Sequence, residues 1–93
     1  MSIRNQLWIG NEWSDAESGE TFEDINPATG ELIVHVAHGG VADVDRAVAA
    51  ARAAMAAKPW RGMNPHKRSA LMWRLADLIE ANADELGKLE TQD

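Results

Sequence analysis

The 93-residue sequence contains no cysteine and no tyrosine, and only one phenylalanine. The absence of cysteine excludes disulfide bonds, thiolate metal ligands and a thiol nucleophile from this stretch of chain. A chain of this length buries about 60–65% of its unfolded surface and makes at most one domain with a thin core.

Long apolar runs are also missing. No stretch of the sequence approaches the ~18–20 apolar residues that cross a bilayer. The first residues, Met1 to Gln6, contain no apolar core of a signal peptide. We therefore expect a cytoplasmic protein that does not contact membranes.

Positive charge is scarce at the start of the chain. Residues 1–40 hold seven acids and one base, the remainder is balanced, and the net charge is −6. Between Lys58 and Arg74 there are five bases and no acid, with Trp60 and Trp73 among them. Bases with interleaved aromatics are typical of nucleic-acid binders, but an acidic chain opposes phosphate binding. We interpret this stretch as an interhelical corner with a solvated helix face, and we expect no nucleic-acid partner.

Catalytic patterns are not apparent in the sequence itself. On a strand, the spacing of His35 and His38 would place them on opposite faces, and His66 is distant, so no metal site is completed. The glycines form neither of the common phosphate-binding loops. Two acidic pairs near expected helix starts complement the helix dipole and are interpreted as structural. These pairs are Asp43 with Asp45 and Asp84 with Glu85.

The first part of the sequence predicts strands. Leu7–Trp13 has a Gly-Asn pair between two short apolar runs, which indicates a hairpin. Thr21–Ile25 and Glu31–Val36 are strand-like and are separated by an Asn-Pro-Ala-Thr-Gly turn. Because Glu31–Val36 is apolar on both faces, we expect it to be covered on both sides.

The second part predicts two helical stretches. An alanine-rich helix is expected at 41–57, followed by a break at 58–63 that contains Pro59. The second stretch, 64–93, begins at Asn64 as N-cap, and its apolar residues recur at three- and four-residue steps. Asn82 is expected to interrupt it as a second N-cap in a capping box with Glu85.

Several short strings occur in a characteristic order along the sequence. They are Trp8–Trp13 (WIGNEW), Ile25–Glu31 (INPATGE), Asp43–Arg52 (DVDRAVAAAR), Pro59–Trp60, Arg74–Glu80 (RLADLIE) and Leu89–Asp93 (LETQD). Each string is weak alone, but the ordered set is specific and extends from Leu7 to Asp93. In this order and at this spacing, the strings resemble the N-terminal region of the NAD(P)-dependent aldehyde dehydrogenase superfamily.

The resemblance implies a fold. The family has a Rossmann-like cofactor domain, a catalytic domain and a small oligomerisation segment. The expected fold class is α/β, and α+β within these residues: two short β-hairpins followed by two amphipathic helical stretches. Residues 1–93 would then be an incomplete N-terminal segment of the cofactor-binding domain, and the complete enzyme would be a homo-oligomer.

The resemblance also implies a reaction. Family members oxidise an aldehyde to a carboxylic acid: a Cys thiolate attacks the carbonyl, hydride passes to NAD or NADP, and a Glu-activated water hydrolyses the thioester. No catalytic or cofactor-binding residue of the family maps onto this sequence, which also lacks cysteine. We therefore expect residues 1–93 alone to be inactive.

One ligand set does map here. Many family members hold a monovalent cation, K+ or Na+, whose ligands by resemblance fall at Asp24, at the carbonyl oxygen of Ile25, and at Asp93. Carboxylate and carbonyl oxygens are the ligands that a hard cation prefers. The alternative is that Asp24 is a solvated strand residue and Asp93 a frayed end.

Two other functions remain open from the residues. The first is a stand-alone helical interaction module, in which the apolar helix face docks a partner without catalysis. The second, a small nucleic-acid binder that uses Lys58–Arg74, would show binding that weakens as salt rises. We favour a truncated aldehyde dehydrogenase, because the sequence stops at Asp93 without a closing turn.

Overall fold

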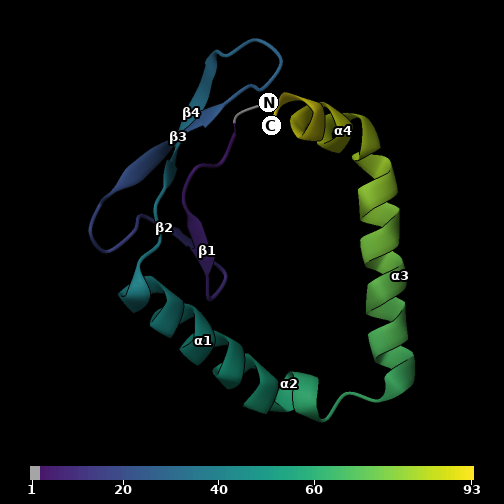
Figure 1. The fold of residues 1–93 in the computed structure, drawn as a ribbon. Coiled ribbons are helices and arrows are strands. Elements are labelled where there is room, and N and C mark those ends of the chain that lie inside the picture. Colours follow the sequence, from purple (N-terminus) through teal and green to yellow (C-terminus); the bar gives the residue numbers. More distant parts are fainter. Residues whose placement is uncertain (1–2) are drawn as a thin grey trace.

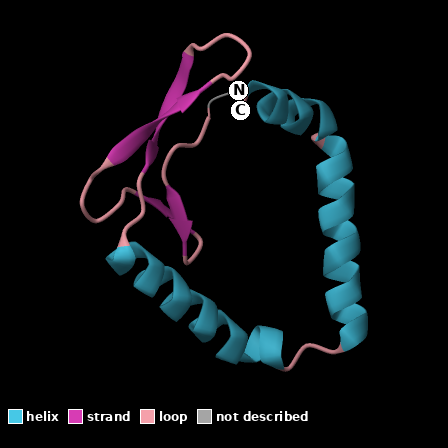
Figure 2. Ribbon diagram, viewed as in Figure 1, coloured by secondary structure: helices cyan, strands magenta, loops and turns pink. Residues whose placement is uncertain are grey.

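The chain forms two antiparallel strand pairs followed by helices, as shown by the computed structural model, which describes residues 3–93 (Figures 1 and 2). The strands are β1 (Leu7–Ile9), β2 (Glu12–Ser14), β3 (Thr21–Ile25) and β4 (Leu32–Ala37). The helices are α1 (Val41–Ala56), α2 (Lys58–Arg61), α3 (Pro65–Ala81) and α4 (Ala83–Gln92). This arrangement confirms the expected α+β class. None of these helices is long and apolar enough to span a membrane.

The first hairpin turns at Gly10 and Asn11, whose φ angles are 59° and 63°. Two consecutive positive φ angles are typical of a type I′ turn, and Gly and Asn tolerate them best. Across the strands, the Trp8 and Trp13 ring centroids lie 4.9 Å apart. The turn approaches α1 closely, because a Cβ added at Gly10 would lie 3.8 Å from the Cβ of Ala50.

The second hairpin pairs β3 with β4 and contains a bulge. The register steps from Asp24 opposite Val34 to Ile25 opposite Leu32, so that Ile33 is passed over. A bulge of this kind bends its strand and increases the local twist. The observed strand lies one residue further along than the expected 31–36.

The N-terminal segment lies along β4. The backbone N–H of Ala37 donates to the Asn5 carbonyl oxygen at 2.8 Å, and the Asn5 side chain donates to the His35 carbonyl at 3.1 Å. These two hydrogen bonds hold the start of the described chain beside the second hairpin.

The corner between the two helical stretches differs from the expectation. α1 ends at Ala56, because Ala57 is extended with a ψ of 136°, and the expected break at 58–63 includes the short helix α2. Pro59 stands in the first turn of α2, where a backbone N–H would have no intrahelical acceptor. Pro59 therefore lies at the start of α2, and the chain leaves the helical conformation at Ala57 instead.

The two expected asparagine caps have different outcomes. Asn64 caps α3 as predicted, since its side-chain oxygen accepts from the Lys67 N–H at 3.0 Å. The capping box at Asn82 is wrong: no side-chain cap is formed, and the Asn82 amide donates back to the Leu78 carbonyl at 2.8 Å. Asn82 thus ends α3 by capping a carbonyl, and α4 starts without a side-chain acceptor.

The elements are arranged as a thin ring rather than around a core. Figure 1 shows α1, α2, α3 and α4 following one another around an arch whose end returns to the strands. Among the described residues, the only buried apolar side chains are Ala16 and Ala37. The radius of gyration is 16.8 Å, whereas a compact domain of this length has about 12 Å. The ring therefore leaves most of its apolar side chains in contact with solvent.

One buried carboxylate connects the strands to the helices. Asp43, in the first turn of α1, is 4% exposed and accepts from the Gly40 N–H at 2.9 Å and from the Glu17 N–H at 3.0 Å. The Arg46 guanidinium donates to the same carboxylate at 3.0 Å. The Gly40 hydrogen bond, the Arg46 hydrogen bond and the Glu17 hydrogen bond, in that order, hold the pKa of Asp43 below its ordinary value of 3.8.

Asp43→Asn is expected to lower the thermal unfolding midpoint of the protein by several degrees at neutral pH. A neutral amide offers one acceptor oxygen and no charge to Arg46. Because the folded-state pKa of Asp43 is lowered, its stabilisation is present above pH 3.8 and is lost as the pH falls through the folded-state pKa. The difference between wild type and variant should therefore shrink in that acidic range. Circular dichroism melts from pH 2 to 7 measure both effects, with the exposed Asp45→Asn as control; equal midpoints for the two variants would contradict the assignment.

Candidate functional site

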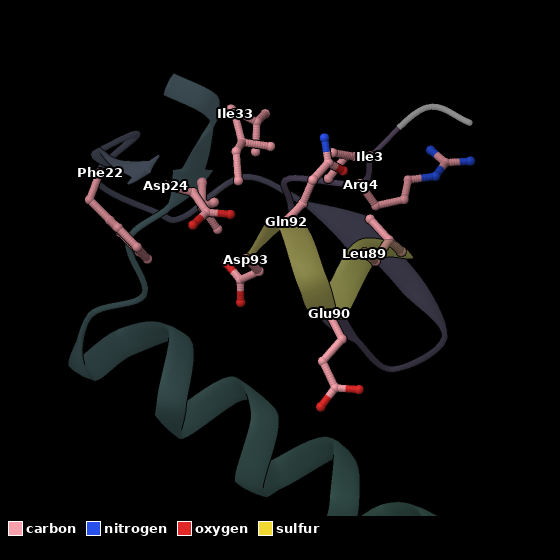
Figure 3. Close-up of a pocket in the computed structure, with 11 residues that line it drawn as sticks. Ile3, Arg4, Phe22, Asp24, Ile33, Leu89, Glu90, Gln92 and Asp93 are labelled. Carbon is pink, nitrogen blue, oxygen red and sulfur yellow. The ribbon is translucent and has the colours of Figure 1, made fainter. Parts of the chain in front are cut away.

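The ring closes at a pocket between the N-terminal segment, the second hairpin and the end of α4, which we call the terminal pocket (Figure 3). Its volume is about 510 Å³. Apolar side chains dominate the lining, and polar groups come from the N-terminal segment, β3 and the last turn of the chain. The lining residues are Ile3, Arg4, Phe22, Asp24, Ile33, Val34, Val36, Leu89, Glu90, Gln92 and Asp93.

Two of the three expected cation ligands meet in the terminal pocket. Asp24 extends from β3 and Asp93 follows α4, and Figure 3 shows the two carboxylates close together. A side-chain hydrogen bond with Asp93 raises the pKa of the Asp24 carboxyl above 3.8, and desolvation and the Asp93 charge act in the same direction. The two groups therefore meet most favourably when one proton lies between them.

The third expected ligand, Ile25, is adjacent in sequence but does not line the pocket. It lies at the end of β3, opposite Leu32 and just after the register shift. Within residues 3–93, there is no group of three or more His, Cys, Asp or Glu side chains that could hold a metal ion. A cation here would therefore depend on the two carboxylates together with backbone carbonyl oxygens.

No basic side chain neutralises the two carboxylates within the described part of the chain. Arg4 lines the same pocket, but its guanidinium lies over the Trp13 ring, 5.2 Å from the centroid. The ion pairs recorded among residues 3–93 involve Asp43, Glu23 and Glu20, and none includes Asp24 or Asp93. The pair thus has unbalanced negative charge whenever both groups are ionised.

The histidines are not assembled into a site. His35 lies 4.0 Å from Glu23, while His38 lies 3.5 Å from Glu20 and edge-on to Phe22. These are two separate exposed pairs along the second hairpin.

Part of the basic stretch Lys58–Arg74 is used within the chain. The Arg68 guanidinium lies 5.0 Å from the centre of the Trp60 ring and donates to the Trp60 carbonyl at 3.2 Å. These contacts link α2 to α3 and agree with the interpretation of an interhelical corner.

Several residues that line the terminal pocket were not predicted from the sequence. Ile3 and Arg4 belong to no motif, and Gln92 stands inside the familiar final string without a role of its own. The one available signal was Leu89, which continues the apolar periodicity of the last helical stretch. Their meeting depends on how the ring closes, which no local pattern encodes.

Most of the chain is similar in sequence to known dehydrogenases. The model of the aldehyde dehydrogenase family matches residues 13–93. The mitochondrial aldehyde dehydrogenase of Sus scrofa is 53% identical over 90 residues, which cover 96% of this chain and 17% of that protein. The mitochondrial 10-formyltetrahydrofolate dehydrogenase of Mus musculus is 45% identical and covers 100% of this chain and 10% of its own length.

Solved structures agree with the sequence matches. Indole-3-acetaldehyde dehydrogenase of P. syringae, in complex with NAD+ and IAA, superposes with a TM-score of 0.94 at 43% identity, covering 99% of this chain and 19% of its own. An NAD+ complex of aldehyde dehydrogenase from Bacillus cereus gives a TM-score of 0.92 at 40% identity, covering 98% and 18%. The chain thus spans less than a quarter of the length of these relatives. These matches give no support to a stand-alone interaction module.

The contact between Asp24 and Asp93 is expected to weaken as the pH rises. Because the folded-state pKa of Asp24 is raised, the stabilisation is complete below pH 3.8 and is lost as the pH passes through the raised value. Carbon-13 NMR titration of the carboxyl groups should give Asp24 a pKa above 3.8, and Asp93→Asn should lower it. A wild-type Asp24 that titrates at its ordinary value, or one unaffected by Asp93→Asn, would show that the carboxyls do not meet.

Proposed function

This chain belongs to the aldehyde dehydrogenase family, and on that premise we propose that it is the N-terminal segment of the cofactor-binding domain of an enzyme that oxidises an aldehyde to a carboxylic acid. The observation that carries this proposal is the family match over residues 13–93, together with the arrangement that those residues share with solved dehydrogenases. The relatives solved with NAD+ favour NAD as the oxidant over NADP.

Within that enzyme, residues 1–93 supply structure rather than chemistry. The thioester route needs a thiolate nucleophile, and the sequence has no cysteine. The sequence also contains no phosphate-binding glycine loop, so its residues do not provide the usual anchor for a dinucleotide. The nucleophile, the general base and the cofactor contacts then belong to another part of the enzyme.

The proposal extends to partners and location. The substrate is an aldehyde, the partner of this segment is the remainder of the dehydrogenase chain, and the complete enzyme is a homo-oligomer. We propose a cytoplasmic location, although several relatives are named as mitochondrial forms.

We further propose that the terminal pocket binds a monovalent cation, K+ or Na+, between Asp24, the Ile25 carbonyl oxygen and Asp93. The support is the chemistry of the donors: two carboxylates meet without a basic partner among residues 3–93. Ile25 follows Asp24 directly in the sequence but does not line the pocket, so a cation would have to draw its carbonyl oxygen toward the two carboxylates. A hard cation would relieve the repulsion between the ionised carboxylates and link the end of α4 to β3.

The enzymatic proposal is tested on the native protein, purified from the organism that produces it. We expect an intact mass several times the 10.2 kDa of this chain and NADH formation when an aldehyde is supplied. The purified 93-residue chain should form no NADH under the same conditions, because it lacks the nucleophile. Absorbance at the NADH maximum and intact-mass spectrometry make the two measurements.

Two results would refute the enzymatic proposal. The first is a native mass near that of the 93-residue chain with no aldehyde oxidation. The second is turnover by the isolated 93 residues, which would place the chemistry within them. An aldehyde oxidised by the native protein with the isolated chain inactive supports the proposal.

The cation proposal predicts ion-specific stabilisation at neutral pH. At constant ionic strength, K+ or Na+ should raise the unfolding midpoint of wild-type protein relative to tetramethylammonium, which is too large for the site. Asp93→Asn should remove that difference, whereas Glu90→Gln, on the same last turn, should retain it. Equal midpoints in all three salts would refute a monovalent cation site.

A further inference from the structure

The terminal pocket contains a base that its carboxylates do not contact. Arg4 lines the pocket together with Asp24 and Asp93. Figure 3 shows its side chain pointing away from both carboxylates, and the guanidinium lies 5.2 Å from the centre of the Trp13 ring. A guanidinium has five N–H donors, and no hydrogen bond recorded among residues 3–93 uses those of Arg4. These donors are therefore available to another partner.

The backbone holds Arg4 within reach of the carboxylates. The next residue, Asn5, donates from its side chain to the His35 carbonyl, so the N-terminal segment follows one edge of β4. At the other edge of β4, Asp24 pairs with Val34, the residue before His35. Because neighbouring strands lie about 4.8 Å apart, Arg4 and Asp24 are separated by about two strand spacings. An arginine side chain with its three-methylene stem can span that separation.

The two possible partners of Arg4 differ in strength. The Trp13 ring is 40% exposed, and cation–π contacts at exposed sites are weak. Two carboxylates offer a guanidinium charge-assisted, bidentate hydrogen bonds, which are stronger. Glu90 also lines the pocket, but in Figure 3 it points away from Asp24 and Asp93. The two aspartates are therefore the stronger partner for Arg4 when no metal cation lies between them.

We propose that Arg4 is the counter-ion of the terminal pocket: its guanidinium moves between the Trp13 ring and the carboxylates of Asp24 and Asp93, where it competes with a monovalent cation. The competition rests on the proposed cation site, whereas the contact between Arg4 and the carboxylates does not. When the cation is scarce, the N-terminal segment acts as a strap whose arginine closes the pocket. K+ or Na+ displaces the guanidinium back to Trp13.

The test measures unfolding midpoints of the complete protein at neutral pH and constant ionic strength, as K+ replaces tetramethylammonium in steps. The K+ concentration at half of the full rise gives the apparent affinity. Arg4→Gln should lower that concentration about threefold or more, because a site that is blocked for roughly two-thirds of the time binds its ligand about threefold more weakly. Trp13→Leu removes the alternative partner of Arg4 and should raise that concentration.

The opposite signs of these two changes distinguish competition from a structural role, since a loosened N-terminal segment would move both variants in the same direction. Arg4→Lys keeps a positive charge without the bidentate guanidinium, so its half-saturating K+ concentration should lie between those of wild type and Arg4→Gln. Arg74→Gln is the matched control. It removes a base from α3, which Figure 1 shows away from the strands, and should leave the K+ dependence unchanged.

Two results would overturn the inference. The first is a half-saturating K+ concentration that Arg4→Gln leaves unchanged or raises. The second is a change of the same sign in Arg4→Gln and Trp13→Leu. Circular dichroism checks that each variant is folded, and if Trp13→Leu is not, the comparison of Arg4→Gln with Arg4→Lys and Arg74→Gln decides the first result.

A double-mutant cycle in tetramethylammonium alone separates this inference from the cation proposal. Arg4→Gln should lower the unfolding midpoint less in the Asp93→Asn background than in wild type, and equally in the Glu90→Gln background. This coupling without any K+ effect on wild type refutes the cation site alone and retains the contact between Arg4 and Asp93. A K+ effect without the coupling refutes the inference alone. Neither measurement depends on aldehyde oxidation, so the enzymatic proposal is tested separately.

Discussion

The Asp43 carboxylate fixes the direction in which the helices leave the strands. It accepts from the Gly40 N–H at the start of α1, from the Glu17 N–H in the loop after the first hairpin, and from Arg46 one turn along. A buried carboxylate with three donors is held in one geometry, because any movement leaves a buried charge unsatisfied. The ring has almost no buried apolar side chains. The hydrogen bonds of Asp43 therefore orient α1 relative to the strands, which a packed core normally does.

The other end of the ring closes with charges of the same sign. Asp24 and Asp93 meet without a basic partner among residues 3–93. Their side-chain hydrogen bond, desolvation and the Asp93 charge raise the pKa of Asp24, so closure is favoured when Asp24 is protonated. The two junctions thus have opposite pH dependence, since Asp43 stabilises the structure when ionised and the Asp24 contact does so when protonated. The proposed cation would replace the shared proton and keep the ring closed at pH values where Asp24 is ionised.

Local features of the fold were predictable from the sequence, whereas closure was not. Gly10-Asn11 and Asn64 act through their own backbone or the next turn, so their identity predicts their structure. Asn82 shows the limit of this approach: a cap-like residue with Glu85 three positions later fits a capping box, yet its amide caps the Leu78 carbonyl of the preceding helix instead. The contact between Asp24 and Asp93 joins residues that are far apart in the sequence. Only the family resemblance placed them together; the residue pattern alone could not.

The exposed apolar face of α3 and the thin core have one cause: the described residues bury little of their apolar surface against one another. Folding must offset about 1–2 kcal/mol of backbone entropy for each ordered residue, and burial of apolar surface is the main favourable contribution. A ring that buries only Ala16 and Ala37 among its described apolar side chains gains little from burial, so its stability depends on surface supplied by something else. The periodicity that forms α3 also places Leu71, Leu75 and Leu78 on one exposed face of the helix. The thin core and the exposed apolar face thus support the proposal that the segment forms one wall of a larger domain.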